Sequence, residues 1–249
     1  MFRLLFLYVL LFGAVTTVDG SNKSTASYEM RQQGSFYTSV TNLLQKYVKD
    51  GQVKYKALQQ DVPRLEQLAK QIAAYDLSKA SGAEKKAFYI NAYNVLVLRQ
   101  VMEHYPLKSV IDVPGFFDKQ KYKVAGEYLT LNELEKKKLL LPYKDARIHF
   151  ALVCAAKSCP PLLDEAYTPE LVEKQLEAQT RLALNNSTFM KVQPKQVQVS
   201  EIFKWYEADF LAEAPGILAY INKYRNKPIP KQNKVGYYTY NWALNESVE

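Results

Sequence analysis

Residues 81–104 read SGAEKKAFYINAYNVLVLRQVMEH. Ser81 and Glu84 have the spacing of a capping box, in which two side chains satisfy the free N–H groups at the start of a helix. The pattern predicts a helix from Ser81 to about His104. Polar residues interrupt its apolar positions, so this stretch is predicted to be a central core helix and not a membrane span.

Asn91 and Asn94 share a face of this predicted helix with Ala87 and Leu98. A buried amide needs hydrogen-bond partners, because leaving one unpaired costs about 1–3 kcal/mol. One interpretation is that the two amides tie the helix to sheet edges or loop backbone. The other is that one of them orients His149, as the amide does in Cys-His-Asn sites.

Segments on both sides of this helix carry further signals. Apolar residues recur at helical spacing over 36–47 and 65–75. Three more helix starts are predicted from N-cap residues at Thr130, Thr168 and Ser200. Strands are predicted as a hairpin over 122–131, a buried strand over 147–154 and a second hairpin over 190–200. These elements predict an α+β fold, mostly helical, in which a single domain packs around a small antiparallel sheet.

The chain begins MFRLLFLYVLLFGAVTTVDG, with a basic residue, an apolar run and then small residues. This order is typical of a secretory signal peptide over residues 1–20, and the apolar run is shorter than the ~20 residues that a membrane span needs. We therefore expect a secreted or extracytoplasmic protein with no transmembrane segment after cleavage. The rest is predicted to comprise a flexible segment (21–34), one globular domain (35–230) and a C-terminal tail (231–249).

Composition and motifs exclude several classes of function. The net charge is +8, but the basic residues are scattered among acids, whereas nucleic-acid binding needs a continuous basic face. The sequence has no Gly-rich phosphate loop, no G-x-S-x-G and no H-E-x-x-H, so nucleotide hydrolysis, serine esterase chemistry and zinc proteolysis lack support. With two cysteines and two histidines in the whole chain, we expect no metal site and no cofactor.

Residues 147–162, RIHFALVCAAKSCPPL, contain both cysteines and His149. In an extended strand, His149 and Cys154 would point to opposite faces and lie ~16 Å apart. Cys159 follows a turn-like stretch and precedes Pro160. If a helix begins there, its terminal N–H groups would lower the pKa of the Cys159 thiol, which makes Cys159 the better nucleophile candidate.

The same two cysteines are also close enough in sequence to form a disulfide in an oxidising compartment. Closing so short a loop would stabilise the fold by about 2 kcal/mol. The residues alone leave the disulfide, Cys154 to Cys159, and the free nucleophile open.

Three further residues are candidates for binding. Trp205 and Tyr206 are adjacent, so on a helix they cannot face the same side, and we expect one to pack inward while the other lines a groove. Arg147 is the third. Glu135 is expected either to orient His149 or to pair with Arg147.

Six blocks of the sequence, in this order, resemble a known family. They are YVKDGQVKYKAL, AFYINAYNVLVLRQVMEHYPLKSV, VAGEYLTLNELE, RIHFALVCAAKSCPPL, AYTPELVEKQLEAQ and SEIFKWYEADF. The chain is similar to the family called domain of unknown function 547, whose activity is not established. One difference is that Glu135 is followed by Lys136, where the family pattern usually has histidine. The resemblance implies altered chemistry in this chain if that histidine takes part in the family's reaction.

Two hypotheses of function follow. The first is a thiol-dependent hydrolase or acyltransferase with papain- or transglutaminase-like chemistry. Its nucleophile would be Cys159 or Cys154, its base His149, and its orienting residue Asn91, Asn94 or Glu135. The second is a non-catalytic exported module, stiffened by the disulfide, that binds a peptide, protein or glycan in an aromatic groove.

Overall fold

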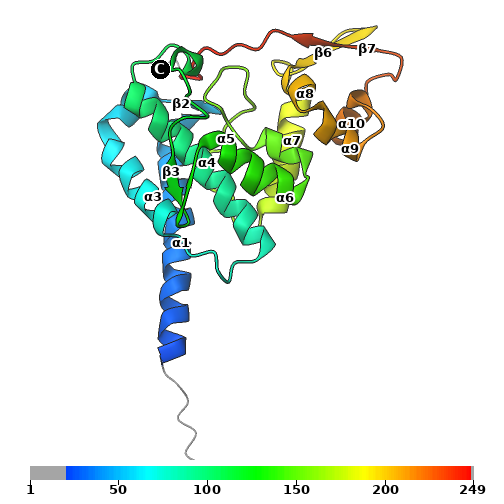
Figure 1. Ribbon diagram of the computed structural model, residues 1–249. Helices are drawn as coiled ribbons and strands as arrows, with labels where there is room; N and C mark the ends of the chain where they lie inside the picture. The colour runs from blue at the N-terminus through cyan, green and yellow to red at the C-terminus, as the bar shows by residue number, and fades with distance from the viewer. Residues whose placement is uncertain (1–20, 248–249) are drawn as a thin grey trace, which may run out of the picture.

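The computed structural model describes residues 21–247 (Figure 1). The predicted signal peptide lies outside these residues. The helices are α1 Ser21–Tyr47, α2 Tyr55–Leu58, α3 Val62–Ala74, α4 Gly82–His104, α5 Leu131–Glu133, α6 Leu141–Tyr143, α7 Val172–Asn185, α8 Ile202–Trp205, α9 Glu207–Glu213 and α10 Ile217–Tyr224. Short 3₁₀ segments are η1 Gln59–Asp61, η2 Val110–Asp112 and η4 Ala146–Phe150, and η3 Leu134–Leu140 is a π-helix.

The strands form three small sheets. They are β1 Val48–Lys49, β2 Gln52–Val53, β3 Tyr122–Val124, β4 Glu127–Leu129, β5 Lys191–Val192, β6 Gln196–Ser200 and β7 Lys234–Tyr238. The β1–β2, β3–β4 and β5–β6 pairs are antiparallel, and β7 pairs with β6 in parallel. The predicted α+β class, mostly helical, is confirmed.

The helix α4 is the centre of the larger core, as its sequence predicts. Its N-cap, Ser81, accepts a hydrogen bond from the backbone N–H of Glu84 at 3.1 Å. Most of its residues are buried, and α3 packs along it. A second predicted start is a complete capping box, because Thr130 and Glu133 each accept a hydrogen bond from the other's backbone N–H. The helix predicted at Thr168 begins later, at Val172.

Both predicted hairpins are confirmed. The β3–β4 pair turns at Ala125 and Gly126, whose φ angles are 46° and 85°. Positive φ at both central residues gives the twist that a two-residue hairpin needs, and Gly126 adopts it without steric cost. The β5–β6 pair forms the second hairpin within residues 190–200.

The strand predicted over residues 147–154 is wrong. Residues 146–150 form the 3₁₀ segment η4, and the Asp145 side chain caps it by accepting a hydrogen bond from the N–H of Arg147. The next residues do not pair with a neighbouring strand, because the amide of Asn94 takes their hydrogen bonds. It donates to the Ala151 carbonyl at 2.9 Å and accepts from the Val153 N–H at 3.0 Å.

The ends of the domain also differ from expectation. Residues 234–238 are a strand and not part of a tail, and Leu244 beyond them is buried. The chain after β7 runs back across the molecule from the β6 region (Figure 1). At the other end, α1 includes the segment 21–34 that we expected to be flexible, and it projects from the body (Figure 1). Among the described residues, no helix is long and apolar enough to cross a membrane.

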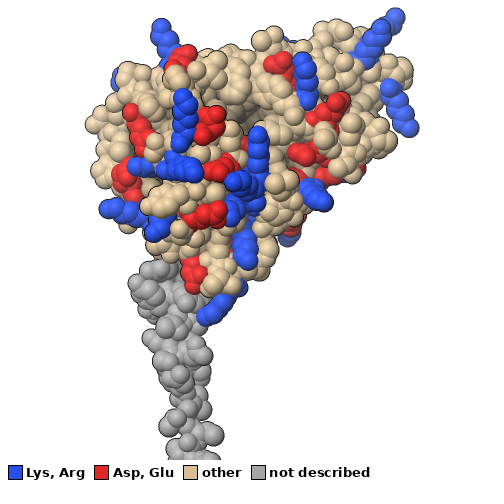
Figure 2. All heavy atoms as spheres, in the orientation of Figure 1, with Lys and Arg blue, Asp and Glu red and all other residues tan. Residues whose placement is uncertain are grey.

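Two hydrophobic clusters fill the interior. The larger one involves α1, α3, α4 and the β3–β4 hairpin, and the smaller one involves β6 and α8 to α10. Cys159 and Trp242 pack against both clusters. The basic side chains on the face in Figure 2 lie among acidic ones and form no continuous patch.

Candidate functional site

A cleft of about 280 Å³ lies close to the junction of the two clusters. Its walls come from α4, η3, η4, the loop that holds the cysteines, α8 and the chain after β7. Six of the residues predicted from sequence line it: Glu135, His149, Cys154, Cys159, Trp205 and Tyr206. Asn91, Asn94 and Arg147 do not.

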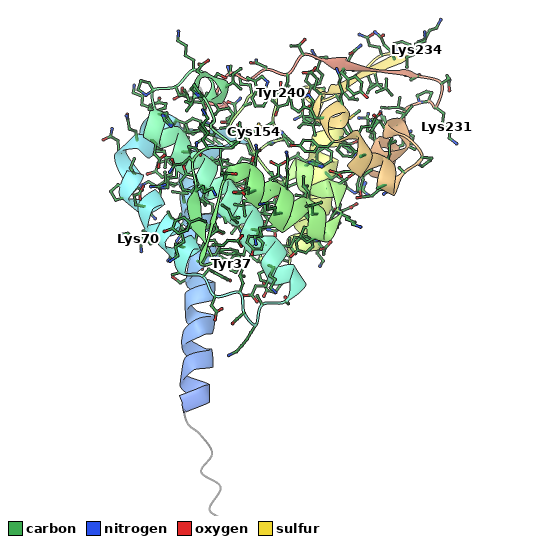
Figure 3. All side chains as sticks on the ribbon, viewed as in Figure 1. Tyr37, Lys70, Cys154, Lys231, Lys234 and Tyr240 are labelled. Atoms are coloured by element: carbon green, nitrogen blue, oxygen red, sulfur yellow. The ribbon has the colours of Figure 1, made fainter. Side chains whose placement is uncertain are left out.

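The two cysteines share one hydroxyl group, that of Tyr240, which lies near Cys154 in Figure 3. The Sγ of Cys159 accepts hydrogen bonds from the backbone N–H of Cys154 at 3.1 Å and from the Tyr240 hydroxyl at 3.2 Å. The Sγ of Cys154 is 3.2 Å from the same hydroxyl oxygen. The two sulfurs are in direct contact, an arrangement that fits either two thiols or a disulfide, and both residues are partly exposed.

These contacts give the two thiols different acidities. Burial acts to raise the pKa of Cys159, but hydrogen bonds from Cys154, Tyr240 and the backbone outweigh it, so this pKa is lowered. The hydrogen bond to Cys159, followed by burial, raises the pKa of Cys154 well above its usual value. If both residues are thiols, Cys159 is therefore the more acidic of the pair.

The donors that stabilise Cys159 are not those expected from the sequence. No helix begins at Pro160, so Cys159 is not a helix N-cap. The loop instead turns sharply at Ala155, whose φ is 63°, and this turn precedes the return of the chain to Cys159. The hydroxyl donor, Tyr240, comes from the segment that was expected to be a tail.

His149 lies in η4 and is held by a residue that sequence analysis missed. Its Nε2 donates a hydrogen bond to Oδ2 of Asp209 at 2.8 Å, and this bond lowers the pKa of Asp209. The imidazole packs on the ring of Tyr206, with the ring centroids 4.0 Å apart. Asp209 lies in α9, within the block SEIFKWYEADF. The local sequence signal for its role was its spacing of three and four residues from Tyr206 and Trp205.

Glu135 lies in the π-helix η3 and lines the cleft. It is 7% exposed, and its Oε1 accepts a hydrogen bond from the Tyr206 hydroxyl at 2.6 Å. Glu135 therefore holds the ring that packs on His149, and it does not pair with Arg147. Arg147 instead binds Asp145 and Glu173 outside the cleft.

Asn91 and Asn94 have the structural role, as the first interpretation proposed. Asn91 accepts from the N–H of Tyr167 at 3.0 Å and donates to its carbonyl at 2.7 Å. Asn94 binds Ala151 and Val153, so it fixes the backbone just before Cys154. Neither amide hydrogen-bonds to His149 among these contacts.

Trp205 and Tyr206 both line the cleft, contrary to the expectation that one would pack inward. The reason is that α8 ends at Trp205 and Tyr206 lies between α8 and α9, outside helical geometry. Trp205 is 46% exposed and stacks on Trp242, with a centroid distance of 5.8 Å and an interplanar angle of 23°. Trp242, like Tyr240, was missed because both lie in the expected tail.

The acidic and thiol groups do not gather into a metal centre. Within the part of the chain that the structure describes, no three His, Cys, Asp or Glu side chains are placed to hold a metal ion.

The comparisons with known proteins give a match to one family model and nothing beyond it. Residues 77–182 match the family model described as a protein of unknown function, DUF547. Four of the six sequence blocks lie inside this match, whereas YVKDGQVKYKAL and SEIFKWYEADF lie outside it. No curated protein and no solved structure matches the chain. The region that resembles the domain of unknown function 547 family, residues 77–182, supplies Glu135, His149 and both cysteines of the cleft.

Proposed function

We propose that the protein is a thiol-dependent hydrolase or acyltransferase with Cys159 as its nucleophile. The observation that carries this proposal is the set of hydrogen bonds around one sulfur. The Cys154 N–H and the Tyr240 hydroxyl both donate to Cys159, in a cleft that is also lined by His149, whose imidazole is hydrogen-bonded to Asp209. A lowered thiol pKa is what nucleophilic cysteines have in common.

The reaction proceeds through a thioester. The Cys159 thiolate attacks an acyl carbonyl carbon, a C–S bond forms, and the leaving group departs with a proton. Water or another acceptor then attacks the thioester, loses a proton and releases the thiolate. The Asp209 carboxylate accepts a hydrogen bond from His149 and orients its imidazole, and His149 carries the protons between the thiol, the leaving group and the attacking water.

An activated ester tests the proposal. With p-nitrophenyl acetate, the wild-type protein should release a burst of p-nitrophenolate, and Cys159→Ala should lower the acylation rate at least about a hundredfold. Cys154→Ala is the matched control, and it should retain the burst with a smaller loss. An equal burst from the Cys159→Ala protein would exclude Cys159 as the nucleophile.

The adjacent sulfurs support a second candidate function, the non-catalytic binding module stiffened by a disulfide. A bond between Cys154 and Cys159 would remove the thiolate and leave the aromatic cleft as a binding groove. Intact mass after treatment with iodoacetamide, with and without prior reduction, separates the two. Uptake of two equivalents without reduction favours the thiol enzyme, and uptake only after reduction favours the disulfide form.

We also propose that the chain is exported and cleaved after Gly20, as the order of its first residues indicates. Expression with residues 1–20 in a secreting host should give a product whose N-terminal sequence begins at Ser21. A soluble product that still begins at Met1 would contradict this.

A further inference from the structure

The charge inside the cleft is opposite to that of the whole protein. The chain carries a net charge of +8, but no Lys or Arg of the described residues lines the cleft. Its buried acid, Glu135, forms none of the salt bridges found between described residues. The cleft therefore carries negative charge within a cationic molecule.

A buried carboxylate without a cationic partner is costly, because burial removes it from water and one hydrogen bond offsets only part of the loss. For Glu135, that hydrogen bond is the one donated by the Tyr206 hydroxyl. Its charge reaches other groups of the cleft. The pKa values of Tyr93 and Tyr206 are both raised. Burial is the largest cause, and the negative charge of Glu135 is the next. A cation in the cleft would offset this cost.

The remaining walls suit a cation that carries alkyl groups. Trp205, Tyr240 and Trp242 line the cleft, with centroid distances of 4.9 Å between Trp205 and Tyr240 and 4.8 Å between Tyr240 and Trp242. Aromatic rings attract ammonium groups through their electron-rich faces, most strongly where water is excluded. A volume of about 280 Å³ is at the lower limit for small-molecule sites, so it fits a side chain or a small amine.

We propose that the cleft binds an alkylammonium group, with the Glu135 carboxylate and the aromatic residues Trp205, Tyr240 and Trp242 as its recognition elements. This inference rests on the proposed function in one respect, because it places the ammonium group of the substrate beside the Cys159 thiolate. Anionic substrates would be repelled by Glu135 and by the thiolate.

The intrinsic fluorescence of the protein tests this directly, because the chain has two tryptophans and both line the cleft. Choline chloride and n-butylammonium chloride would be titrated at constant ionic strength, with 3,3-dimethylbutan-1-ol as the neutral isostere of choline. We expect a saturable change with at least one ammonium ion, and binding of the alcohol at least about tenfold weaker than that of choline if choline is the ligand. A saturable signal with choline indicates a quaternary ammonium ligand, and a saturable signal with n-butylammonium indicates a primary one.

A pair of variants distinguishes a specific effect of Glu135 on ammonium binding from an effect of the protein's overall charge. Glu135→Gln retains an oxygen that accepts from Tyr206, and it should weaken ammonium binding at least about tenfold. Glu170→Gln removes an exposed acid near Tyr37, on the other side of the molecule from Tyr240 (Figure 3), and it should leave binding unchanged. Thermal melting of both variants would check that each one folds.

Three results would overturn the inference: no saturable change with either ammonium ion, equal binding of the neutral alcohol, or unchanged binding in folded Glu135→Gln. The titration does not depend on catalysis. Cys159→Ala should still bind the ammonium ion, so a failure of the thiol chemistry and a failure of cation recognition give different results.

Discussion

Tyr240 is the residue whose hydroxyl links the two thiols, and its effect on Cys159 is open to measurement. Removing the hydroxyl in Tyr240→Phe takes away a hydrogen bond that stabilises the thiolate, so the pKa of Cys159 should rise. The rate of alkylation by iodoacetamide, followed against pH in a Cys154→Ala background, should shift to higher pH. The matched control is Tyr237→Phe, which removes a hydroxyl from an exposed side chain of β7 and should leave the profile in place. An identical profile for both variants would show that Tyr240 does not stabilise the thiolate.

The buried side-chain amides of Asn91 and Asn94 allow a second test at the level of single residues. Asn94→Leu leaves the Ala151 carbonyl and the Val153 N–H without their partner, which should lower the free energy of unfolding by about 2 kcal/mol or more. Urea unfolding would measure this. Asn91→Leu should behave similarly, because it releases both backbone groups of Tyr167. Midpoints equal to that of the wild type would contradict the role assigned to these two residues.

At the level of the elements, the capping box joins the β3–β4 hairpin to the π-helix that carries Glu135. Thr130→Ala removes the acceptor for the Glu133 N–H and should destabilise the protein by about 1 kcal/mol in urea unfolding. Ser81→Ala at the start of α4 is a useful comparison, because it removes the same kind of cap at an exposed site. No loss of stability in Thr130→Ala would show that η3 does not depend on this cap.

The Glu133 carboxyl makes the same cap sensitive to acid. The backbone N–H of Thr130, followed by Lys137, lowers the pKa of Glu133 from 4.5 to about 2. Because this pKa is depressed in the folded protein, the stabilisation is present above pH 4.5 and is lost as the pH falls towards 2. Glu133→Gln should therefore flatten the dependence of the unfolding midpoint on pH in that window. An unchanged pH dependence would contradict this account.

The elements also show what a single sequence can predict. Capping boxes and two-residue turns are local, so α4, α5 and the β3–β4 hairpin were predictable from their own residues. The strand predicted at residues 147–154 failed because its backbone is bound by an asparagine from α4, and no pattern within the segment indicates that. Both cysteines and His149 were identified by residue type. Asp209, Tyr240 and Trp242 were not, because long-range packing alone brings Tyr240 and Trp242 to the cleft and Asp209 to His149.

On the scale of the whole molecule, the segment after residue 233 should be essential to the fold. It provides β7, which pairs with β6. It also provides Leu244 to the larger cluster, Tyr240 to the smaller cluster, and Trp242, which packs against both. A chain that ends at Asn233 should melt at a lower temperature and without a single cooperative transition. Circular dichroism and calorimetry would measure this. Melting like that of the full chain would show that the segment is an appendage, as its sequence suggested.

The same segment determines when the site can form during synthesis. A ribosome that has passed residue 210 has already made the cysteines, His149 and Asp209, but the hydroxyl that completes the thiolate's hydrogen bonds is still to come. Until Tyr240 is made, Cys159 lacks one of its hydrogen-bond donors. The pKa of the Cys159 thiol should therefore be higher in a nascent chain that stops before Tyr240 than in one that includes it.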